Sequence, residues 1–325
     1  MENVSEISSA NSSDLEYVWT AGESYVVGGY FILTGLLGVF GNGIVLSMFS
    51  IYKALRTPTN MLFINLAVND IGMCLCLFPI AGISSFKRVW IFGTTGCQWY
   101  GFTGMLFGLA NIGFLTAISV DRYLITCKYY IYCHLKHFHY HLIALCVWIS
   151  AAVWAFFPLF GWGRYAEEAG GIACAVDWES RDHSMTTYIT TIFVVCFLIP
   201  LLIISVCYLR VCMFIRKLGH GTQENPEWTN QKDVTKMCAI AIICFIIAWM
   251  PYAVICLWSI YGHPDYIPNS VQILPSLFAK SSASYNPLIY VALNRRFRLA
   301  IVKMFRCNND QRPLEEELRM KNLMC

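Results

Sequence analysis

The chain has 325 residues, of which 57% are hydrophobic and 13% are charged, and its formal net charge is +3. Soluble globular proteins carry about 25% charged residues, so this composition excludes an ordinary soluble domain. It also gives no support for nucleic-acid binding, which needs a concentrated basic face beside a recognisable motif.

Seven stretches are long and apolar enough to cross a membrane as helices, because a hydrocarbon core of about 30 Å needs about 20 apolar residues. In chain order they cover residues 24–52, 61–86, 89–120, 142–163, 184–209, 237–264 and 266–294. Asp70 is the one charged residue in the second stretch and Lys280 the one in the seventh. The sequence therefore predicts an all-α membrane protein, a seven-transmembrane helix bundle.

Lys and Arg are distributed unevenly between the two sides of this predicted bundle. One side carries 18 of them, and the side of the N-terminus carries four: Lys87, Arg88, Arg164 and Arg181. Cytoplasmic loops hold the excess of Lys and Arg, so we expect a multi-pass plasma-membrane protein with its N-terminus outside. Its expected parts are an extracellular segment (1–23), a helical domain ending in a short amphipathic cytosolic helix 8 (24–306), and a disordered tail (307–325).

The cysteines and sequons fit this orientation. Cys97 and Cys174 are the two cysteines expected on the extracellular face, where oxidising conditions favour a disulfide over two free thiols. Asn3 and Asn11 begin N-glycosylation sequons on the same face. Cys307 follows the basic stretch after the last span, where it is either a palmitoylation site or a plain cytosolic thiol.

Short motifs lie at defined depths in three spans. Asp121-Arg122-Tyr123 ends the third span, Trp249-Met250-Pro251-Tyr252 lies midway along the sixth, and Asn286-Pro287-Leu288-Ile289-Tyr290 lies near the cytosolic end of the seventh. With Asn42, Asp70, Trp148 and the pair Cys97 and Cys174, they make residues 25–306 resemble the rhodopsin-like G-protein-coupled receptor family.

That resemblance implies coupling to a heterotrimeric G protein, with arrestin, a receptor kinase and membrane lipid as further partners. It implies a cytosolic switch that consists of Asp121, Arg122, Tyr123, Tyr208, Asn286, Pro287 and Tyr290. The alternative for Arg122 is a solvated ion pair with Asp121. An intramembrane carboxylate is costly unless it is paired or hydrated, so we expect Asp70 to join a water or sodium network with Asn42 and Asn286. No metal centre is predicted elsewhere.

Lys280 stands alone in the seventh span: 14 uncharged residues precede it, and another 14 follow it. At about 1.5 Å per helical residue, roughly 20 Å of uncharged helix lies on either side. Burial favours the neutral amine of a lysine, and such an amine is a nucleophile toward carbonyl groups. Lys280 therefore indicates a covalently held aldehyde, a salt bridge to a carboxylate, or an anchor for an acidic ligand.

The segment FAKSSASYNP, with Lys280 six residues before Asn286, resembles the retinal-attachment motif of the opsins. This resemblance implies retinal, 11-cis or all-trans, bound to Lys280 as a Schiff base. The side chains expected around retinal are Tyr100, Phe245, Trp249, Tyr252 and Ser276.

A protonated Schiff base needs an anion beside it. In vertebrate visual pigments this is a glutamate three residues after the third-span cysteine, but here that position holds Tyr100, and tyrosine is neutral near pH 7. The other opsin counterion lies six residues before the second cysteine, and that position is Glu168. We therefore expect Glu168 to be the counterion; Glu167 is its rival, and a solvated loop glutamate is the remaining alternative.

The segment from Phe245 to Tyr290 is most similar to the neuropsins, and next to the peropsins and retinal photoisomerases. The leading prediction is a non-visual opsin, a light-activated receptor rather than an enzyme, whose photoproduct is stable and reverts with a second photon. Two alternatives stay open: a retinal photoisomerase, and a receptor for a diffusible ligand that uses Lys280 as an ionic anchor.

Overall fold

The computed structural model describes residues 20–52, 55–168, 170–218, 226–262, 274–293 and 295–305. Among these, six helical segments are long and apolar enough to cross a membrane. They are α1 (Ala21–Ile51), α2 (Asn60–Lys87), α3 (Gly93–Cys127), α5 (His137–Phe156) with a 3₁₀ turn (Phe157–Phe160), α6 (His183–Ile192) running on into α7 (Ile199–Leu218), and α8 (Pro226–Tyr261).

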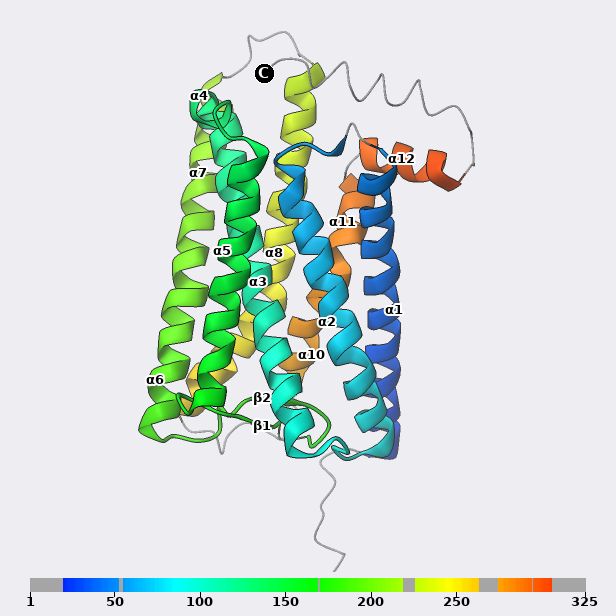
Figure 1. The fold of residues 1–325 in the computed structure, drawn as a ribbon, viewed down its shortest axis with the longest axis vertical. Coiled ribbons are helices and arrows are strands. Elements are labelled where there is room, and N and C mark those ends of the chain that lie inside the picture. The colour runs from blue at the N-terminus through cyan, green and yellow to red at the C-terminus, as the bar shows by residue number, and fades with distance from the viewer. Residues whose placement is uncertain are drawn as a thin grey trace, which may run out of the picture.

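The seventh span is divided into shorter pieces: α10 (Leu274–Ser281), a 3₁₀ turn (Ser282–Ser284) and α11 (Tyr285–Leu293). The short helices α4 (Tyr129–Tyr132) and α12 (Arg295–Phe305) lie at one end of the bundle, and α12 runs across the bundle axis (Figure 1). The prediction of a seven-helix bundle followed by a short helix 8 is confirmed. The sequons at Asn3 and Asn11, and Cys307, lie outside the described residues.

Local chemistry explains why the seventh span is interrupted. The hydroxyls of Ser281, Ser282 and Ser284 each donate to the carbonyl three residues earlier, at 2.7 to 2.9 Å, and such bonds compete with the helical pattern. Pro287 has no N–H to offer the carbonyl of Ala283 four residues before it. The side-chain amide of Asn42 on α1 donates to that carbonyl instead, at 3.0 Å.

The fifth span contains a π-helical turn, Phe193–Leu198, between α6 and α7. Pro200 is the second residue of α7, just after this turn, and proline cannot supply the usual helical hydrogen bond. The extra residue of a π-turn changes the direction of the side chains around it. Phe193, Cys196 and Phe197 consequently face the interior cavity described below.

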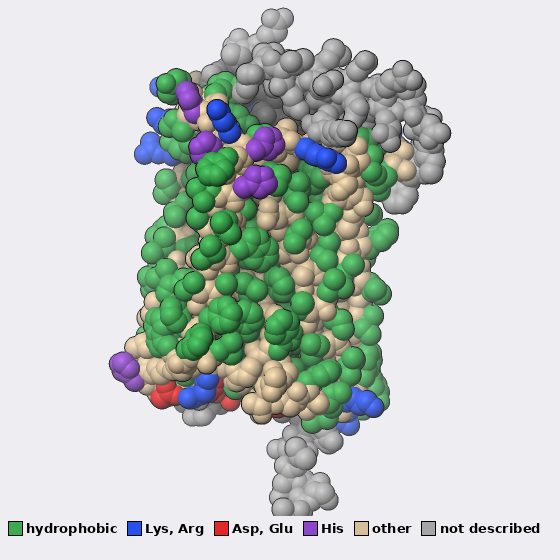
Figure 2. Space-filling view, in the orientation of Figure 1, with side chains coloured by type: hydrophobic (Ala, Val, Ile, Leu, Met, Phe, Trp, Pro, Cys, Tyr) green, Lys and Arg blue, Asp and Glu red, His purple; other side chains and the backbone are tan. Residues whose placement is uncertain are grey.

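The outer surface of the bundle is that of a membrane protein. Hydrophobic side chains cover its middle, whereas Lys, Arg and His gather at the end that carries α4 and α12 (Figure 2). Exposed apolar residues such as Leu36, Phe40 and Leu209 belong to this middle zone. A soluble protein rarely exposes an apolar surface of this extent, so the chain is a multi-pass membrane protein.

A two-stranded antiparallel hairpin, β1 (Tyr165–Glu167) and β2 (Cys174–Val176), lies at the opposite end of the bundle (Figure 1). Its register pairs Tyr165 with Val176 and Glu167 with Cys174. The predicted disulfide is present, since Cys97 at the start of α3 is bonded to Cys174. Gly101, one turn further along α3, leaves room for the ring of Tyr165, which a methyl group there would meet at 2.5 Å. The hairpin is therefore held against α3.

Candidate functional site

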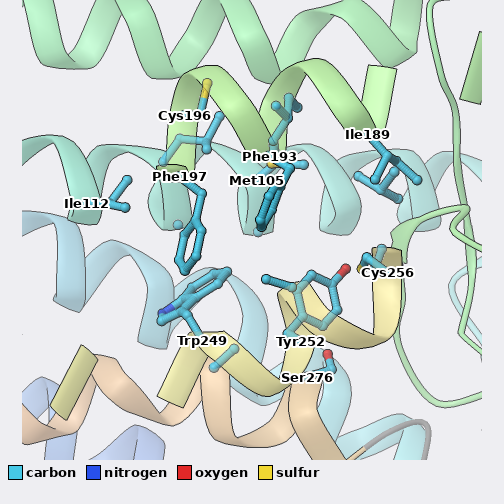
Figure 3. A pocket seen from close by; sticks show the side chains of 18 of the residues that line it. Met105, Ile112, Ile189, Phe193, Cys196, Phe197, Trp249, Tyr252, Cys256 and Ser276 are labelled. Atoms are coloured by element: carbon cyan, nitrogen blue, oxygen red, sulfur yellow. The ribbon is translucent and has the colours of Figure 1, made fainter. Parts of the chain in front are cut away.

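A cavity lies between the helices, on the inner side of the hairpin. It holds about 1070 Å³ of empty space, which includes space open to solvent. Its lining is largely apolar and comes from α3, the hairpin, the fifth span, α8 and the seventh span. Figure 3 shows Trp249 and Tyr252 of α8 across the cavity from Phe193 and Phe197.

Lys280 forms part of this lining and is 8% exposed. Its Nζ donates to the hydroxyl of Ser276 at 2.7 Å, one turn earlier on α10. The same nitrogen lies 3.4 Å from Oε2 of Glu168 and 5.1 Å from the centre of the Tyr100 ring. The carboxylate stabilises the ammonium form, which opposes the preference of a buried lysine for neutrality. Lys280 therefore forms a salt bridge with Glu168, which was one of the three interpretations of this lysine. The same geometry also suits an opsin counterion.

The hairpin separates the two candidate glutamates. Glu167 is on the strand and its side chain is exposed, whereas Glu168, the next residue, is 7% exposed. The Glu168 backbone N–H donates to the carbonyl of Ala173 at 2.8 Å, and its own carbonyl accepts from Gly171 at 2.8 Å. These bonds fix the turn so that Glu168 points inward toward Lys280, while Glu167 points outward.

The five side chains expected around retinal have different positions. Phe245, Trp249, Tyr252 and Ser276 line the cavity. Tyr100 is fully buried beside Lys280 and stacks edge to face on Trp90, with ring centres 5.5 Å apart, but it is not part of the lining. Tyr100 therefore contacts Lys280 on the side that faces away from the cavity.

Trp249 is held from three sides. Its indole N–H donates to the hydroxyl of Ser282 at 3.1 Å, and its ring stacks on Phe245 with centres 5.6 Å apart. Gly108 of α3 lies against the indole so closely that an added methyl group would come within 2.6 Å of it. Ser282 is two residues from Lys280, so a direct chain of contacts joins the lysine segment to α8. Sequence reasoning did not identify Ser282; its place in the SSAS run was the available signal.

Toward the end of the bundle that carries α4 and α12, Asp121 and Arg122 form a buried ion pair. Asp121 also accepts from the hydroxyl of Tyr140 on α5 at 2.5 Å and from that of Thr59 at 3.3 Å. The pair is therefore not the solvated one of the alternative interpretation. Tyr140 and Thr59 were not identified from the sequence, which offered no signal for them.

The remaining residues of the predicted switch lie around this pair and along α11. Tyr123 is half-buried on α3, and Tyr208 on α7 is partly buried against the core. Tyr290 packs edge to face on both Phe63 and Phe297, with ring centres 5.9 and 5.7 Å apart. Because Phe297 belongs to α12, Tyr290 connects the seventh span to helix 8.

The intramembrane carboxylate Asp70 is fully buried and has two amide donors. Asn286 donates directly to its Oδ2 at 2.8 Å, and Asn111 of α3 donates to its Oδ1 at 2.7 Å. The expected partner Asn42 instead donates to the backbone carbonyls of Gly38 and Ala283, both at 3.0 Å. Asn111, the residue that replaces it, was not identified from the sequence.

The loop around the hairpin is fixed by charge pairs. Arg164 contacts Asp177 at 2.7 Å and Asp182 at 2.5 Å. Asp182 caps α6 by accepting the backbone N–H of Met185 at 3.0 Å. This backbone bond, and then Arg164, hold the pKa of the Asp182 carboxyl below its usual value.

The residues of the cavity fit retinal. An apolar, aromatic lining suits a polyene, and Lys280 offers a primary amine at the cavity wall. The carboxylate of Glu168 lies close enough to balance a positive charge on that nitrogen. Among the residues that the structure describes, no group of three or more metal-ligating side chains is present.

The similarity to known proteins agrees with this geometry. Residues 41–290 match the family described as 7 transmembrane receptor (rhodopsin family). The chain is 40% identical over 310 residues to the visual pigment-like receptor peropsin of Homo sapiens, covering 93% of this chain and 91% of that protein. It is 36% identical over 282 residues to Opsin-5 of Homo sapiens, covering 84% and 79% respectively. The crystal structure of squid rhodopsin matches with a TM-score of 0.83 at 31% identity, covering 94% of this chain and 93% of that one.

The chain therefore belongs to the rhodopsin family of seven-transmembrane receptors, whose members couple to heterotrimeric G proteins. Within that family it is an opsin, since its relatives in the peropsin, Opsin-5 and rhodopsin groups cover most of its length. The sequence indicated the neuropsins first and the peropsins next. Opsin-5 is a neuropsin, so both subgroups are among these relatives, and the identity is higher for peropsin.

Proposed function

We propose that this opsin holds retinal covalently on Lys280 and acts as a light-activated receptor for a heterotrimeric G protein, with Glu168 as the counterion. The observation that carries the proposal is the Lys280–Glu168 pair in the wall of an apolar cavity, with Nζ and Oε2 3.4 Å apart. Breaking a buried pair by removing one partner costs about 3–5 kcal/mol, so the two residues hold the hairpin and the seventh span together.

When bound, retinal supplies a light-driven change of shape inside the cavity. The chain's own residues carry that change to the cytosol. Lys280 anchors the ligand, and Trp249 would contact the ligand. Trp249 also donates a hydrogen bond to Ser282, which belongs to the turn that follows Lys280. A shift of the indole alters the packing of α8, and packed helix interfaces respond as bistable elements. Movement of α8 would then expose Arg122, Tyr208 and Tyr290 to the G protein.

We further propose that the protein resides in the plasma membrane with the N-terminus outside, and that its photoproduct is stable and reverts with a second photon. The concentration of Lys, Arg and His at the α4 and α12 end supports this orientation. The location of the counterion in the hairpin, with neutral Tyr100 beside the lysine, supports the assignment to the bistable group. Arrestin and a receptor kinase would bind the same cytosolic end.

The test is the absorption spectrum of purified protein loaded with 11-cis retinal, and separately with all-trans retinal, before and after illumination. We expect a pigment band that is absent in Lys280→Ala, and a photoproduct that a second wavelength reverts. The absence of pigment with either isomer would contradict the proposal and favour a receptor for a diffusible ligand.

The second candidate is a retinal photoisomerase. The chain is 40% identical to peropsin, and its sequence is similar to the peropsins and retinal photoisomerases together. The intact Asp121–Arg122 pair and the Asn286–Asp70 contact favour the receptor, since isomerisation of retinal needs neither. Light-dependent nucleotide exchange on a purified G protein separates the two. Pigment formation with release of the other isomer and no exchange would establish the photoisomerase.

A further inference from the structure

The cytosolic ends of α4 and α5 carry an unusual concentration of histidine. Four of the seven histidines of the chain lie within eight positions: His134, His137, His139 and His141. All four side chains are exposed. Figure 2 shows several histidines beside Lys and Arg at the end of the bundle that carries α4. None of them contacts the cavity, so the proposed function does not use them.

Within residues 122–166, which include α4 and α5, the formal charge has one sign. Lys128, at the end of α3, and Lys136, just before α5, are both exposed beside them. Residues 122–166 contain no Asp or Glu at all. Asp121, on the helix α3 that packs against α4 and α5, is buried and engaged by Arg122, Tyr140 and Thr59. The other titratable groups that α4 and its flanks contribute are tyrosines and a thiol: Tyr129, Tyr130, Tyr132 and Cys133.

The same surface continues into the lipid-facing side of the bundle. Phe138, Leu142, Leu145 and Ile149 are all exposed, and their spacing of four, three and four residues puts them on one face of α5. Phe138 is 71% exposed in the first turn of α5, and Tyr130 on α4 is 80% exposed. His139 and His141 flank Phe138 and Leu142 along the helix. Leu145 and Ile149, further along α5, face the acyl chains of the membrane. The start of α5 at the cytosolic end therefore lies at the depth of the lipid headgroups.

We propose that the cytosolic ends of α4 and α5 form a binding surface for anionic phospholipid headgroups, and that protonation of the histidines adjusts its strength. Lys128 and Lys136 supply permanent charge, while Phe138 and Tyr130 insert beside the acyl chains. Histidine changes charge between about pH 8 and 5. Each cationic side chain near an anionic membrane contributes about 1 kcal/mol, or roughly fivefold in binding.

Two histidines also have local partners that protonation would affect. His139 Nδ1 accepts the backbone N–H of Lys136 at 3.0 Å and so closes the first turn of α5. A proton on this nitrogen cannot coexist with that bond, so acidification frees the His139 ring from the turn. His134 Nδ1 lies 2.7 Å from the carbonyl of Tyr130, where a proton on Nδ1 strengthens the contact. His137 and His141 lie one helical turn apart on α5 and add charge without breaking the cap.

The test measures the preference of the purified full chain for phosphatidylserine over phosphatidylcholine. Native mass spectrometry counts the bound lipids after titration with mixed micelles of the two, at pH 7.5 and at pH 6.0. We expect the preference to rise about fivefold or more on acidification. The quadruple variant His134→Gln, His137→Gln, His139→Gln, His141→Gln should change by less than twofold, whereas His183→Gln at the opposite end should behave as the parent chain does.

A second variant tests the permanent charge. Lys128→Gln with Lys136→Gln should lower the preference at both pH values and leave its pH dependence in place. Thermal unfolding, followed by intrinsic fluorescence, establishes that each variant is folded. A pH response that survives in the quadruple variant, or no effect of the lysine pair, would overturn the proposal. So would a quadruple variant with normal lipid preference and impaired G-protein activation in pure phosphatidylcholine vesicles, since this assigns the surface to a protein partner. Failure of pigment formation in the parent chain, by contrast, concerns the cavity alone.

Discussion

Lys280 and Glu168 are 112 positions apart in the chain, yet the Nζ and Oε2 atoms lie 3.4 Å apart in the interior of the bundle. The contact exists because the Cys97–Cys174 disulfide and the β1–β2 register fix the hairpin next to the seventh span. A charge on the lysine nitrogen thereby has one well-placed carboxylate among the described residues.

Glu168→Gln should lower the pH at which the retinal pigment loses its long-wavelength band by one unit or more. The reason is that loss of the paired carboxylate destabilises the cationic nitrogen, and one unit corresponds to about 1.4 kcal/mol. A spectrophotometric pH titration measures this midpoint. Glu167→Gln is the matched control, because that neighbouring side chain is exposed. Equal shifts in both variants would contradict the assignment of the counterion.

Gly108→Ala should disturb the pigment, because the new methyl group would come within 2.6 Å of the indole of Trp249. Overpacking of this kind costs about 1–3 kcal/mol, so we expect a lower yield of pigment and a displaced absorption maximum. Gly104→Ala is the control one turn away, where the nearest atom lies at an ordinary 3.8 Å. Indistinguishable spectra of the two variants would show that Trp249 does not bear on the ligand.

Tyr140→Phe should raise G-protein activation in the dark. The phenol donates to the buried carboxylate of Asp121, and a hydrogen bond to a charged group contributes about 1.5–3 kcal/mol. Its loss weakens the arrangement that holds Arg122, so dark nucleotide exchange should increase about tenfold. Tyr130→Phe, which removes a hydroxyl from an exposed ring on the neighbouring helix, should leave the dark rate unchanged. Dark activity that stays at the parent level in Tyr140→Phe would remove this tyrosine from the switch.

Asp182→Asn should lower the thermal midpoint near neutral pH, and the difference from the parent chain should vanish in acid. The pKa of Asp182 is held below its usual value by the Met185 N–H and by Arg164. A carboxyl with a lowered pKa stabilises the fold above its unfolded pKa, about 3.9 for Asp. This stability is lost as the pH falls through the lower folded value. Thermal unfolding at pH 7, 5 and 3 checks the trend, and a difference that grows toward pH 3 would contradict it.

Much of this protein follows from its sequence alone. The seven spans are evident because a stretch of 20 or more apolar residues has few other stable arrangements. Lys280 can be identified as a functional residue because a single cation in such a stretch is costly and is therefore kept for a function. The disulfide follows from the orientation, since Cys97 and Cys174 are the two cysteines left on the expected outer face.

Other features depend on tertiary structure. Glu168 and Glu167 are adjacent in sequence, and only the hairpin turn directs one inward and the other outward. Asn111, Tyr140 and Ser282 become partners of Asp70, Asp121 and Trp249 through the rotation of their helices about their axes. A soluble helix reveals its rotation through a polar and an apolar face, but lipid is as apolar as the interior of the bundle. The sequence therefore determined which segments cross the membrane, and inter-helix packing decided which polar side chains meet inside it.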